Sequence, residues 1–239
     1  DLKSYKRPQM ERRINSFMRS VNIDDYSGFI NLLSTNRETY RRFLDHITIN
    51  VSEFFRNSNH WEILEKQIIS ELLKDNKKLK IWSAGCSTGE EAYSLAIMCN
   101  ERLISLSDPI LATDIDNEVL EKAEIGIYSE KAVQSMPPAY LKKYFKADGN
   151  YYQINNNIKQ MVRFQQQDLL KDTFGRSFDL ILCRNVVIYF TEESKQKLYR
   201  KFCDALRPRG VLFIGSTEQI FQSRELGLQS IATFFYQKT

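Results

Sequence analysis

From residue 79 onward, short apolar runs alternate with helical patterns, and this alternation constrains the fold more than any other feature of the chain. The first run, Leu79–Ala84, leads into a glycine-containing loop and then into a helical pattern over residues 90–102. The same alternation continues in later apolar runs, at 110–112, 161–164, 178–183 and 211–215. Strands that alternate with helices favour a mostly parallel sheet with helices on both faces. The sequence therefore predicts an α/β domain, which we expect to cover residues 58–239.

The first sixty residues follow a purely helical pattern instead. Apolar residues with the spacing of one buried helix face are Met10, Ile14, Phe17, Met18 and Val21. Two shorter helices are expected to follow, and their candidate capping residues are Asp24 or Asp25 and Thr35 or Asn36. We therefore expect an N-terminal helical domain over residues 1–57.

The positive charge of the chain is concentrated in this N-terminal segment. The whole chain has 34 lysines and arginines against 30 aspartates and glutamates, a net charge of +4. Residues 1–20 carry six basic and two acidic residues, so the remainder is neutral. We expect Arg12, Arg13 and Arg19 to point outward from the first helix. Nucleic-acid-binding proteins usually have a stronger and broader basic field, so an acidic protein surface is a candidate partner; the alternative is a solvated helix face.

One stretch interrupts the alternation of strands and helices. Asp148-Gly149 is a hairpin signal flanked by aromatic residues, in a segment that a strand–helix–strand connection does not require. We therefore expect a small antiparallel β-subdomain, over residues 143–160, inserted into the sheet domain. Insertions are often the place where partner binding is added to a domain. Near the end of the chain, Ala232–Gln237 predicts a last, antiparallel edge strand.

The cysteines and histidines predict neither a metal site nor a disulfide framework. The four cysteines, at positions 86, 99, 183 and 203, lie far apart, and the two histidines stand alone. Zinc sites need clustered ligands, and scattered cysteines of this kind are typical of a reducing cytoplasm. The chain also lacks the run of about 18 apolar residues that would predict a membrane-spanning helix.

The loop Gly85-Cys-Ser-Thr-Gly89, between the first strand and its helix, is the most informative segment. Glycines at a strand end let the backbone turn sharply and approach a ligand closely. The loop lacks the lysine of a phosphate-binding P-loop, and its glycines lack the spacing of a dinucleotide-binding site. Glu90 and Glu91 follow directly, and their carboxylates would repel a pyrophosphate. The site therefore suits a ligand with a positively charged group.

Asp114, at the end of the next strand, lies 25 residues after Gly89. An acid in this position can accept hydrogen bonds from the hydroxyl groups of a ribose. The alternative role is a helix cap, for which Asp116 is the better candidate. A glycine loop, a ribose-binding acid and a preference for cations together point to S-adenosylmethionine, which carries a sulfonium.

Four motifs carry a resemblance to a known family. They are Thr48-Ile-Asn-Val-Ser-Glu-Phe-Phe-Arg56, Trp82-Ser-Ala-Gly-Cys-Ser-Thr-Gly-Glu-Glu-Ala-Tyr-Ser94, Ala112-Thr-Asp-Ile-Asp116 and Cys183-Arg-Asn-Val-Val-Ile-Tyr-Phe190. In this order they resemble the CheR family of chemotaxis receptor glutamate O-methyltransferases, and the resemblance covers nearly the whole chain. It implies a Rossmann-like methyltransferase sheet of seven strands, with S-adenosylmethionine as methyl donor and S-adenosylhomocysteine as product. It also implies that the acceptors are glutamates of chemoreceptor cytoplasmic helices.

The resemblance also assigns roles to individual residues. Glu91 matches the acid that holds the methionine moiety, and Asp114 matches the ribose acid. Asp168 stands beside the adenine position where Asn is usual, so it can accept a hydrogen bond there but cannot donate one. Ser87 stands where a middle glycine is common. Together with the loop glycine, the expected cofactor-binding residues are Asn50, Ser52, Arg56, Gly85, Glu91, Asp114, Asp168, Leu169, Asn185 and Val186.

The implied reaction asks little of the protein beyond alignment of the reactants. A glutamate side chain has a pKa near 4.3 and is already a carboxylate at neutral pH, so its attack on a sulfonium methyl needs no base. We expect Arg56 to orient this carboxylate by charge-assisted hydrogen bonds, together with Tyr189. The alternatives are a surface charge for Arg56 and an ordinary strand-end aromatic residue for Tyr189.

The expected partner is the cytoplasmic helical domain of a chemoreceptor, met by the basic face of the first helix. We expect a cytoplasmic monomer that binds no metal and no nucleic acid and does not insert into a membrane. Some members of the family bind a receptor's C-terminal pentapeptide at the inserted hairpin. Residues 150–157 carry little positive charge here, which favours docking without a pentapeptide.

Two other interpretations remain open at this point. A nucleic-acid methyltransferase usually has an Asn/Asp-Pro-Pro loop after the fourth strand, where this chain reads Arg184-Asn-Val-Val-Ile-Tyr189 without proline. A non-catalytic S-adenosylmethionine-binding scaffold would keep Glu91 and Asp114 but would not need Arg56.

Overall fold

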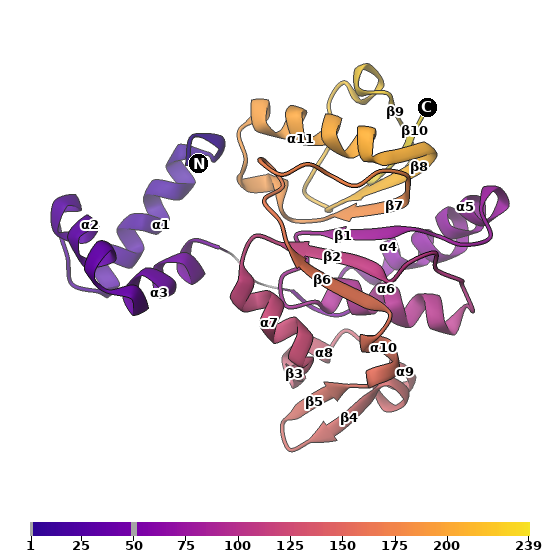
Figure 1. Ribbon diagram of the computed structural model, residues 1–239, viewed down its shortest axis with the longest axis horizontal. Coiled ribbons are helices and arrows are strands. Elements are labelled where there is room, and N and C mark those ends of the chain that lie inside the picture. The colour runs from indigo at the N-terminus through magenta and orange to yellow at the C-terminus, as the bar shows by residue number, and fades with distance from the viewer. Residues whose placement is uncertain (1, 49–51) are drawn as a thin grey trace. The chain divides into compact units, whose positions relative to one another are not determined.

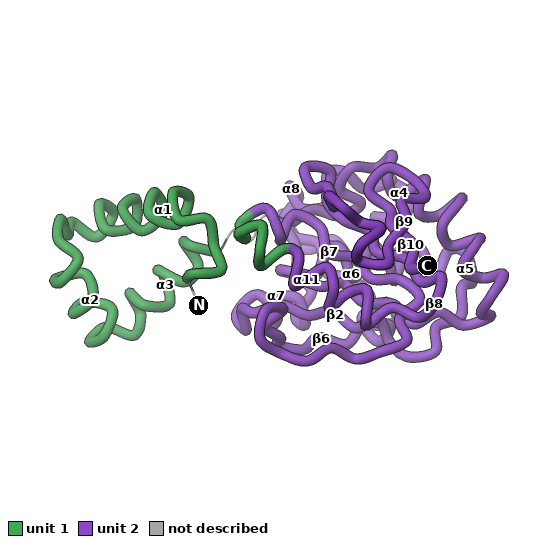
Figure 2. Tube along the Cα trace, turned by 90° about the horizontal axis from the view of Figure 1, so that it is seen from above, with its two compact units in different colours: residues 1–51, 189–195 green, residues 52–188, 196–239 purple. Residues whose placement is uncertain are grey.

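The computed structural model describes residues 2–48 and 52–239, which form two compact units. Unit 1 consists of residues 1–51 with 189–195, and unit 2 consists of residues 52–188 with 196–239 (Figure 2). The sequence assigns residues 52–57 to the helical domain, whereas the structure includes them in unit 2. The physical reason is that the side chains of Phe54 and Phe55 are buried in the core of the sheet domain.

Unit 1 is helical, as the sequence predicts. Its helices are η1 (Leu2–Ser4), α1 (Arg7–Ser20), α2 (Tyr26–Thr35) and α3 (Arg37–Ile47). The apolar face of α1 meets α2 and α3 in a small core, whose buried members are Phe17, Met18 and Phe29. Asp25 caps α2 by accepting a hydrogen bond from the Gly28 N–H, and Asn36 caps α3 in the same way. The structure thus selects one residue of each predicted capping pair.

The basic residues of α1 do not all point outward. Arg12 and Arg19 are exposed, but Arg13 is half-buried. The guanidinium of Arg13 donates to the backbone carbonyl of Ile47, and its Cζ lies 6.0 Å from the centroid of the Tyr189 ring. The expectation of an outward Arg13 is therefore wrong. Residue 13 lies four positions before Phe17, so it sits at the edge of the buried face.

Unit 2 contains the predicted parallel sheet (Figure 1). Its seven strands follow the order β6-β2-β1-β7-β8-β10-β9, and the first five of these run parallel to one another. Their bounds are β1 (Ile81–Ala84), β2 (Ile110–Asp114), β6 (Val162–Gln166), β7 (Phe178–Cys183), β8 (Leu206–Ile214), β9 (Leu228–Ala232) and β10 (Phe235–Lys238). The order reverses between β1 and β7, and at such a switch point ligands bind beyond the carboxyl ends of the strands.

The end of the chain differs from the prediction of one edge strand over Ala232–Gln237. Two strands are present, β10 pairs antiparallel with both β8 and β9, and β9 is the edge strand. Strand β9 has little sequence signal because Gln229 and Ser230 interrupt its apolar residues with exposed polar side chains.

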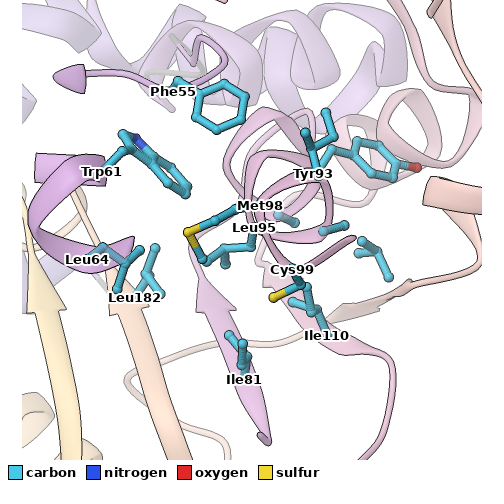
Figure 3. Close-up of a cluster of buried hydrophobic side chains, with 14 of the residues drawn as sticks. Phe55, Trp61, Leu64, Ile81, Tyr93, Leu95, Met98, Cys99, Ile110 and Leu182 are labelled. Carbon is cyan, nitrogen blue, oxygen red and sulfur yellow. The ribbon is translucent and has the colours of Figure 1, made fainter. Parts of the chain in front are cut away.

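Helices cover both faces of this sheet. A large core lies between one face and the helices α4, η2 and α6, and it contains Ile81, Leu95 and Leu182 (Figure 3). Trp82 points to the opposite face, because successive strand residues alternate, and it packs against Phe202 of α11. The helical elements of unit 2 and of its junctions are α4 (Ser58–Ile63), the π-helical η2 (Leu64–Ile69), α5 (Ser70–Asp75), α6 (Glu90–Glu101), α7 (Asn117–Ile125), α8 (Glu130–Val133), α9 (Pro138–Tyr144), α10 (Asn156–Lys159), η3 (Val187–Tyr189), α11 (Glu192–Ala205) and η4 (Ser223–Leu226).

The inserted β-subdomain is a three-stranded antiparallel sheet of order β3-β5-β4. The predicted segment 143–160 contains β4 (Phe145–Asp148) and β5 (Tyr151–Ile154), joined at Gly149. The third strand, β3 (Ile127–Ser129), lies outside that segment and is too short to produce a sequence pattern. Tyr128 of β3 is buried and donates a hydrogen bond from its hydroxyl to the carbonyl of Thr88 at 2.8 Å. The small sheet is therefore attached directly to the glycine loop.

Within residues 2–48 and 52–239, none of the helices combines the length and the apolar composition needed to cross a bilayer.

Candidate cofactor and active site

The glycine loop after β1 has the backbone conformation that its sequence suggests. Gly85 and Gly89 have φ angles of +80° and +91°, a region that favours glycine. The N–H of Gly85 donates to the carbonyl of Thr113, the residue before the end of β2, at 2.7 Å. A Cβ atom at Gly85 would clash with Val186, so that position has to be glycine.

Ser87 occupies the middle of this loop, where a glycine is common in the related family. It has a φ angle of +50°, which is unfavourable for a residue with a side chain. Its N–H donates to Oδ2 of Asp114 at 2.8 Å, and this hydrogen bond fixes the loop against the end of β2. Among the described residues, no group hydrogen-bonds its buried Oγ. That hydroxyl is therefore available to a ligand at the loop.

Asp114 is placed as the sequence predicts, at the carboxyl end of β2. Its Oδ1 accepts a hydrogen bond from the Asp116 N–H at 3.1 Å, in addition to the contact from Ser87. Asp116, and not Asp114, caps α7 by accepting from the Glu118 N–H. Burial raises the pKa of Asp114, because the charged carboxylate loses water. Because Asp116 is the residue that caps α7, the alternative role of Asp114 as a helix cap is excluded.

Glu91 lies in the first turn of α6, next to the end of β1. Its Oε1 accepts a hydrogen bond from the Ser83 hydroxyl at 2.8 Å, and its Oε2 lies 3.4 Å from Nη1 of Arg184. Burial raises the pKa of Glu91, and the charges of Arg184 and Arg56 act against this rise. A further positive charge near Glu91 would stabilise its ionised form still more.

Glu90 differs from Glu91, although both acids were expected to face the ligand. Its side chain is buried, and both carboxylate oxygens accept hydrogen bonds from the Thr88 hydroxyl, at 2.8 and 2.7 Å. Burial raises the pKa of Glu90, and hydrogen bonds from Thr88 and from Ser52 oppose the rise. Glu90 therefore connects the glycine loop to Ser52, which is one of the predicted cofactor residues.

Arg56 lies in a sharply bent segment between the core and α4. Its neighbours Phe55 and Asn57 have φ angles of +51° and +60°, both in the left-handed region. The carbonyl of Arg56 accepts hydrogen bonds from Nε1 of Trp61 at 3.1 Å and from Nη2 of Arg184 at 3.0 Å. Its side chain is 35% exposed, and its charge reaches Glu91, whose pKa it lowers.

Asn185 and Val186 follow β7 at the same edge of the sheet. Asn185 has a φ angle of +60°, and the turn lies against Gly215 and Glu218. Glu218 is buried, and its Oε2 accepts a hydrogen bond from the Gly215 N–H at 2.6 Å. Burial raises the pKa of Glu218, while the N–H groups of Gly215, Asn185 and Val187 oppose the rise.

Asp168 and Leu169 follow β6, which pairs with β2 up to Asp114. The N–H of Gln167 donates to the carbonyl of Asp114 at 2.8 Å, so the two strand ends are neighbours. Oδ1 of Asp168 accepts hydrogen bonds from the N–H groups of Leu170 and of Lys171, at 2.9 and 3.3 Å. The carboxylate of Asp168 thus stabilises its own turn, a role that the sequence did not reveal.

The contacts described within unit 2 do not test two of the predicted site residues. Asn50 lies outside the described residues. Tyr189 belongs to unit 1, where its carbonyl accepts a hydrogen bond from the Lys6 N–H at 2.9 Å and its ring meets Arg13. Its catalytic role stays a prediction.

Three residues at this edge were not singled out from the sequence. Arg184 and Glu218 are buried charged residues, and the signal that could have found Arg184 is a charge directly after the apolar run of β7. The third is His60, whose ring lies 5.0 Å from that of Phe234. Burial and the charge of Arg184 lower the pKa of His60, which favours its neutral form. In the described part of the chain, no cluster of three or more His, Cys, Asp or Glu residues could hold a metal ion.

Comparison with known protein families covers nearly the whole chain. Residues 50–233 match the family model for the CheR methyltransferase, SAM binding domain, and residues 1–48 match that for the CheR methyltransferase, all-alpha domain. The chain belongs to the CheR methyltransferase family. Its α/β unit is therefore an S-adenosylmethionine-dependent methyltransferase domain, as the resemblance of its motifs implied.

Curated relatives agree with this assignment. Chemotaxis protein methyltransferases of Listeria innocua and Listeria monocytogenes are 45% and 43% identical to this chain, in each case over 100% of it and 92% of the relative. The chemotaxis protein methyltransferase of Escherichia coli K12 is 32% identical over 91% of this chain and 78% of the relative. The family therefore links this chain to methylation in chemotaxis.

Proposed function

We propose that this protein transfers the methyl group of S-adenosylmethionine to glutamate side chains of chemoreceptor cytoplasmic helices. The observation that carries the proposal is the proximity of a partly exposed cation, Arg56, to the largely buried acid Glu91 at the carboxyl edge of the sheet. Family membership over both units supports the same conclusion. The positively charged donor would thus bind the acid Glu91, and the acceptor carboxylate would bind the cation Arg56.

Donor binding is assigned to the acids and the loop at the strand ends. Glu91 would bind the amino group of the methionine moiety, and Asp114 would accept hydrogen bonds from the ribose hydroxyls. Gly85 lets the backbone come close, and the buried Ser87 Oγ offers one further polar contact. The remaining proposed contacts come from Ser52, Leu169, Asn185 and Val186, with Asp168 and Asn50. When bound, S-adenosylmethionine supplies an electrophilic methyl group.

Acceptor binding is assigned to Arg56. A glutamate is a carboxylate at neutral pH, so the protein need not remove a proton. The guanidinium of Arg56 can hold one or two carboxylate oxygens by charge-assisted hydrogen bonds. Holding two reactants in attack geometry can lower the barrier by about 7–11 kcal/mol at most. Tyr189 is proposed as a second orienting group.

Partner binding is assigned to unit 1. Arg12 and Arg19 are exposed on α1 and suit the acidic surface of receptor helices. Their effect is expected on encounter rate and salt dependence more than on affinity. We further propose that the protein acts as a cytoplasmic monomer, without metal or nucleic acid, and docks without a receptor pentapeptide.

The decisive experiment follows a tritiated methyl group from S-adenosylmethionine to a purified chemoreceptor cytoplasmic fragment of the same organism. Label that base releases as methanol is the expected result, because a glutamate methyl ester is base-labile. Base-stable label, or label on nucleic acid, would indicate another methyltransferase. Tight S-adenosylhomocysteine binding without any transfer would indicate a non-catalytic scaffold.

A further inference from the structure

Arg184 is a fully buried arginine at the centre of the site, with no role among the predicted site residues. It follows β7 directly, and its side chain is 2% exposed. Arginine is almost never buried to this degree unless it is paired. Burial lowers its pKa, and the nearby carboxylates of Glu91 and Glu218 oppose this effect. These two carboxylates therefore help to keep the buried guanidinium charged.

The guanidinium of Arg184 joins three groups from two separate segments. Nη2 donates to the carbonyl of Arg56 at 3.0 Å and to Oδ1 of Asn57 at 3.1 Å. Nη1 lies 3.4 Å from Oε2 of Glu91. Its Cζ lies 4.7 Å from the centroid of the Phe213 ring, so a cation–π contact fixes the plane of the group. Only the planar fork of an arginine can reach all these partners at once.

The segment around Arg56 needs such contacts to keep its shape. Phe55 and Asn57 both have left-handed φ angles, which are unfavourable for residues with side chains and persist only when surrounding contacts determine them. The N–H of Phe55 donates to Oγ of Ser94 at 3.0 Å, and Trp61 and Arg184 both bind the carbonyl of Arg56. Of these contacts, the one from Arg184 also reaches Glu91.

We propose that Arg184 is a positioning residue that holds the Arg56 segment and the Glu91 carboxylate in one fixed arrangement. The inference rests on the proposed function, in which Arg56 meets the acceptor and Glu91 meets the donor. One guanidinium then sets the distance between the two reactants. The competing role is charge alone, in which Arg184 only neutralises Glu91.

The test compares Arg184→Lys with Arg207→Lys as a matched control. Lysine keeps the charge but not the fork, so kcat for the receptor fragment should fall about 10²-fold, the cost of misplacing a reacting group by about 1 Å. The dissociation constant for S-adenosylhomocysteine should rise less than about 5-fold, because Lys still neutralises Glu91. Arg207 pairs with the buried acid Asp179 near the amino end of β7, away from the proposed site. Its variant should therefore lose thermal stability and keep kcat. An unchanged kcat in Arg184→Lys would refute the proposal.

A double-mutant cycle separates positioning from a general structural role. If Arg184 acts through Arg56, adding Arg184→Lys to Arg56→Ala should lower kcat by less than about 3-fold, since coupled residues are not additive. A full additional loss of about 10²-fold would overturn the proposal.

Hydrogen exchange gives a readout that does not depend on activity. In the ligand-free protein, Arg184→Lys should speed exchange of the Phe54 and Phe55 amides, which are bonded to Ala132 and Ser94, and Arg207→Lys should not. If Arg184→Lys does not fold, Asn57→Gly keeps the left-handed backbone and removes one acceptor of Arg184; it should also speed this exchange and lower kcat. Unchanged exchange in the variants that fold would count against the proposal. If the wild type transfers no methyl group, the proposed function fails, and the exchange experiment still tests Arg184.

Discussion

Strand β7 has a largely buried pair of an arginine and a carboxylate near each end, and the two pairs differ in how fully the carboxylate is bonded. At the amino end, Asp179 accepts hydrogen bonds from Asn76, from the Lys80 N–H and from Arg207. At the carboxyl end, Glu91 accepts one good hydrogen bond, from Ser83, and has Arg184 at 3.4 Å.

The same two residue types therefore serve different purposes. A carboxylate whose oxygens are all bonded by the chain can only stabilise the fold, and removing it leaves an uncompensated charge. A carboxylate with spare capacity, whose burial raises its pKa, can take a donor from a ligand. The number of chain donors on the acid, more than the ion pair itself, distinguishes the amino end of β7 from the carboxyl end, where the donor site is proposed.

The largest effect is expected from Asp179→Ala. Removing the acid leaves Arg207 without its buried partner, so the free energy of unfolding should fall by about 3 kcal/mol, the lower end for a broken buried pair because Arg207 also contacts Asp75. Urea unfolding measures this loss. Affinity for S-adenosylhomocysteine should be unchanged in the folded fraction. A variant with wild-type stability would show that the amino-end pair is not structural.

Arg56→Ala should have the opposite profile. Turnover with the receptor fragment should fall about 10²-fold or more, as expected for a misplaced reacting group, and Arg56→Lys should restore little of it because the planar fork is lost. Cofactor affinity and thermal stability should change much less. A fast Arg56→Ala enzyme in steady-state kinetics would contradict an orienting role.

Donor binding tests the carboxyl end directly. Glu91→Ala and Asp114→Ala should each weaken binding of S-adenosylmethionine by about 1–3 kcal/mol, the cost of an unpaired buried polar group. Calorimetry with S-adenosylhomocysteine, which should compete for the same site, gives the same ranking. Unchanged affinity in both variants would remove these acids from the donor site.

Charge reversal on unit 1 should act on neither end of β7. Arg12→Glu combined with Arg19→Glu should slow receptor methylation several-fold at low salt, and added salt should reduce the difference because exposed charges are screened. Arg13 is left unchanged because it is half-buried and bonded to Ile47. Wild-type rates at low salt would exclude this face as the docking surface.

The smallest effect is a pH dependence. Burial raises the pKa of Glu90, so in the window above its usual value of about 4.5 the folded state binds more protons than the unfolded state, and stability falls as pH rises. Glu90→Gln cannot ionise, so its melting temperature should fall less between pH 5 and pH 8 than that of the wild type. If the melting temperatures of both proteins fell equally with pH, ionisation of Glu90 would not destabilise the folded protein.

Much of the fold was predictable from local pattern. The alternation of apolar runs and helices gave the parallel sheet, and Asp148-Gly149 gave the hairpin of the small sheet. The tail strand β9 and the short β3 were missed because neither has a periodic apolar pattern. The prediction that Arg13 points outward was wrong because a residue at the edge of the apolar face of a helix can face either water or a neighbouring segment.

The site was predictable in part for the same reason. The left-handed turn at Gly85 and the place of Asp114 at a strand end were predictable because both depend on the local sequence, whereas their roles in cofactor binding stay predictions. The positive φ of Ser87 was not predicted, because a serine in the middle of the loop carries no local signal for a left-handed backbone. Local pattern could not distinguish Glu90 from Glu91, because the contacts of each residue depend on which other segments pack against that part of the helix.

By itself, then, the sequence determined which elements form and which strand ends carry acids, because backbone dihedrals and apolar periodicity are set by neighbours in the chain. The tertiary structure alone decided which charges meet. Arg184 reaches Arg56 across 128 positions and Glu91 across 93, and these contacts exist only because β7 lies beside β1 in the sheet. Strand order is fixed by the burial of the whole core, so no local pattern could show that one guanidinium holds both segments.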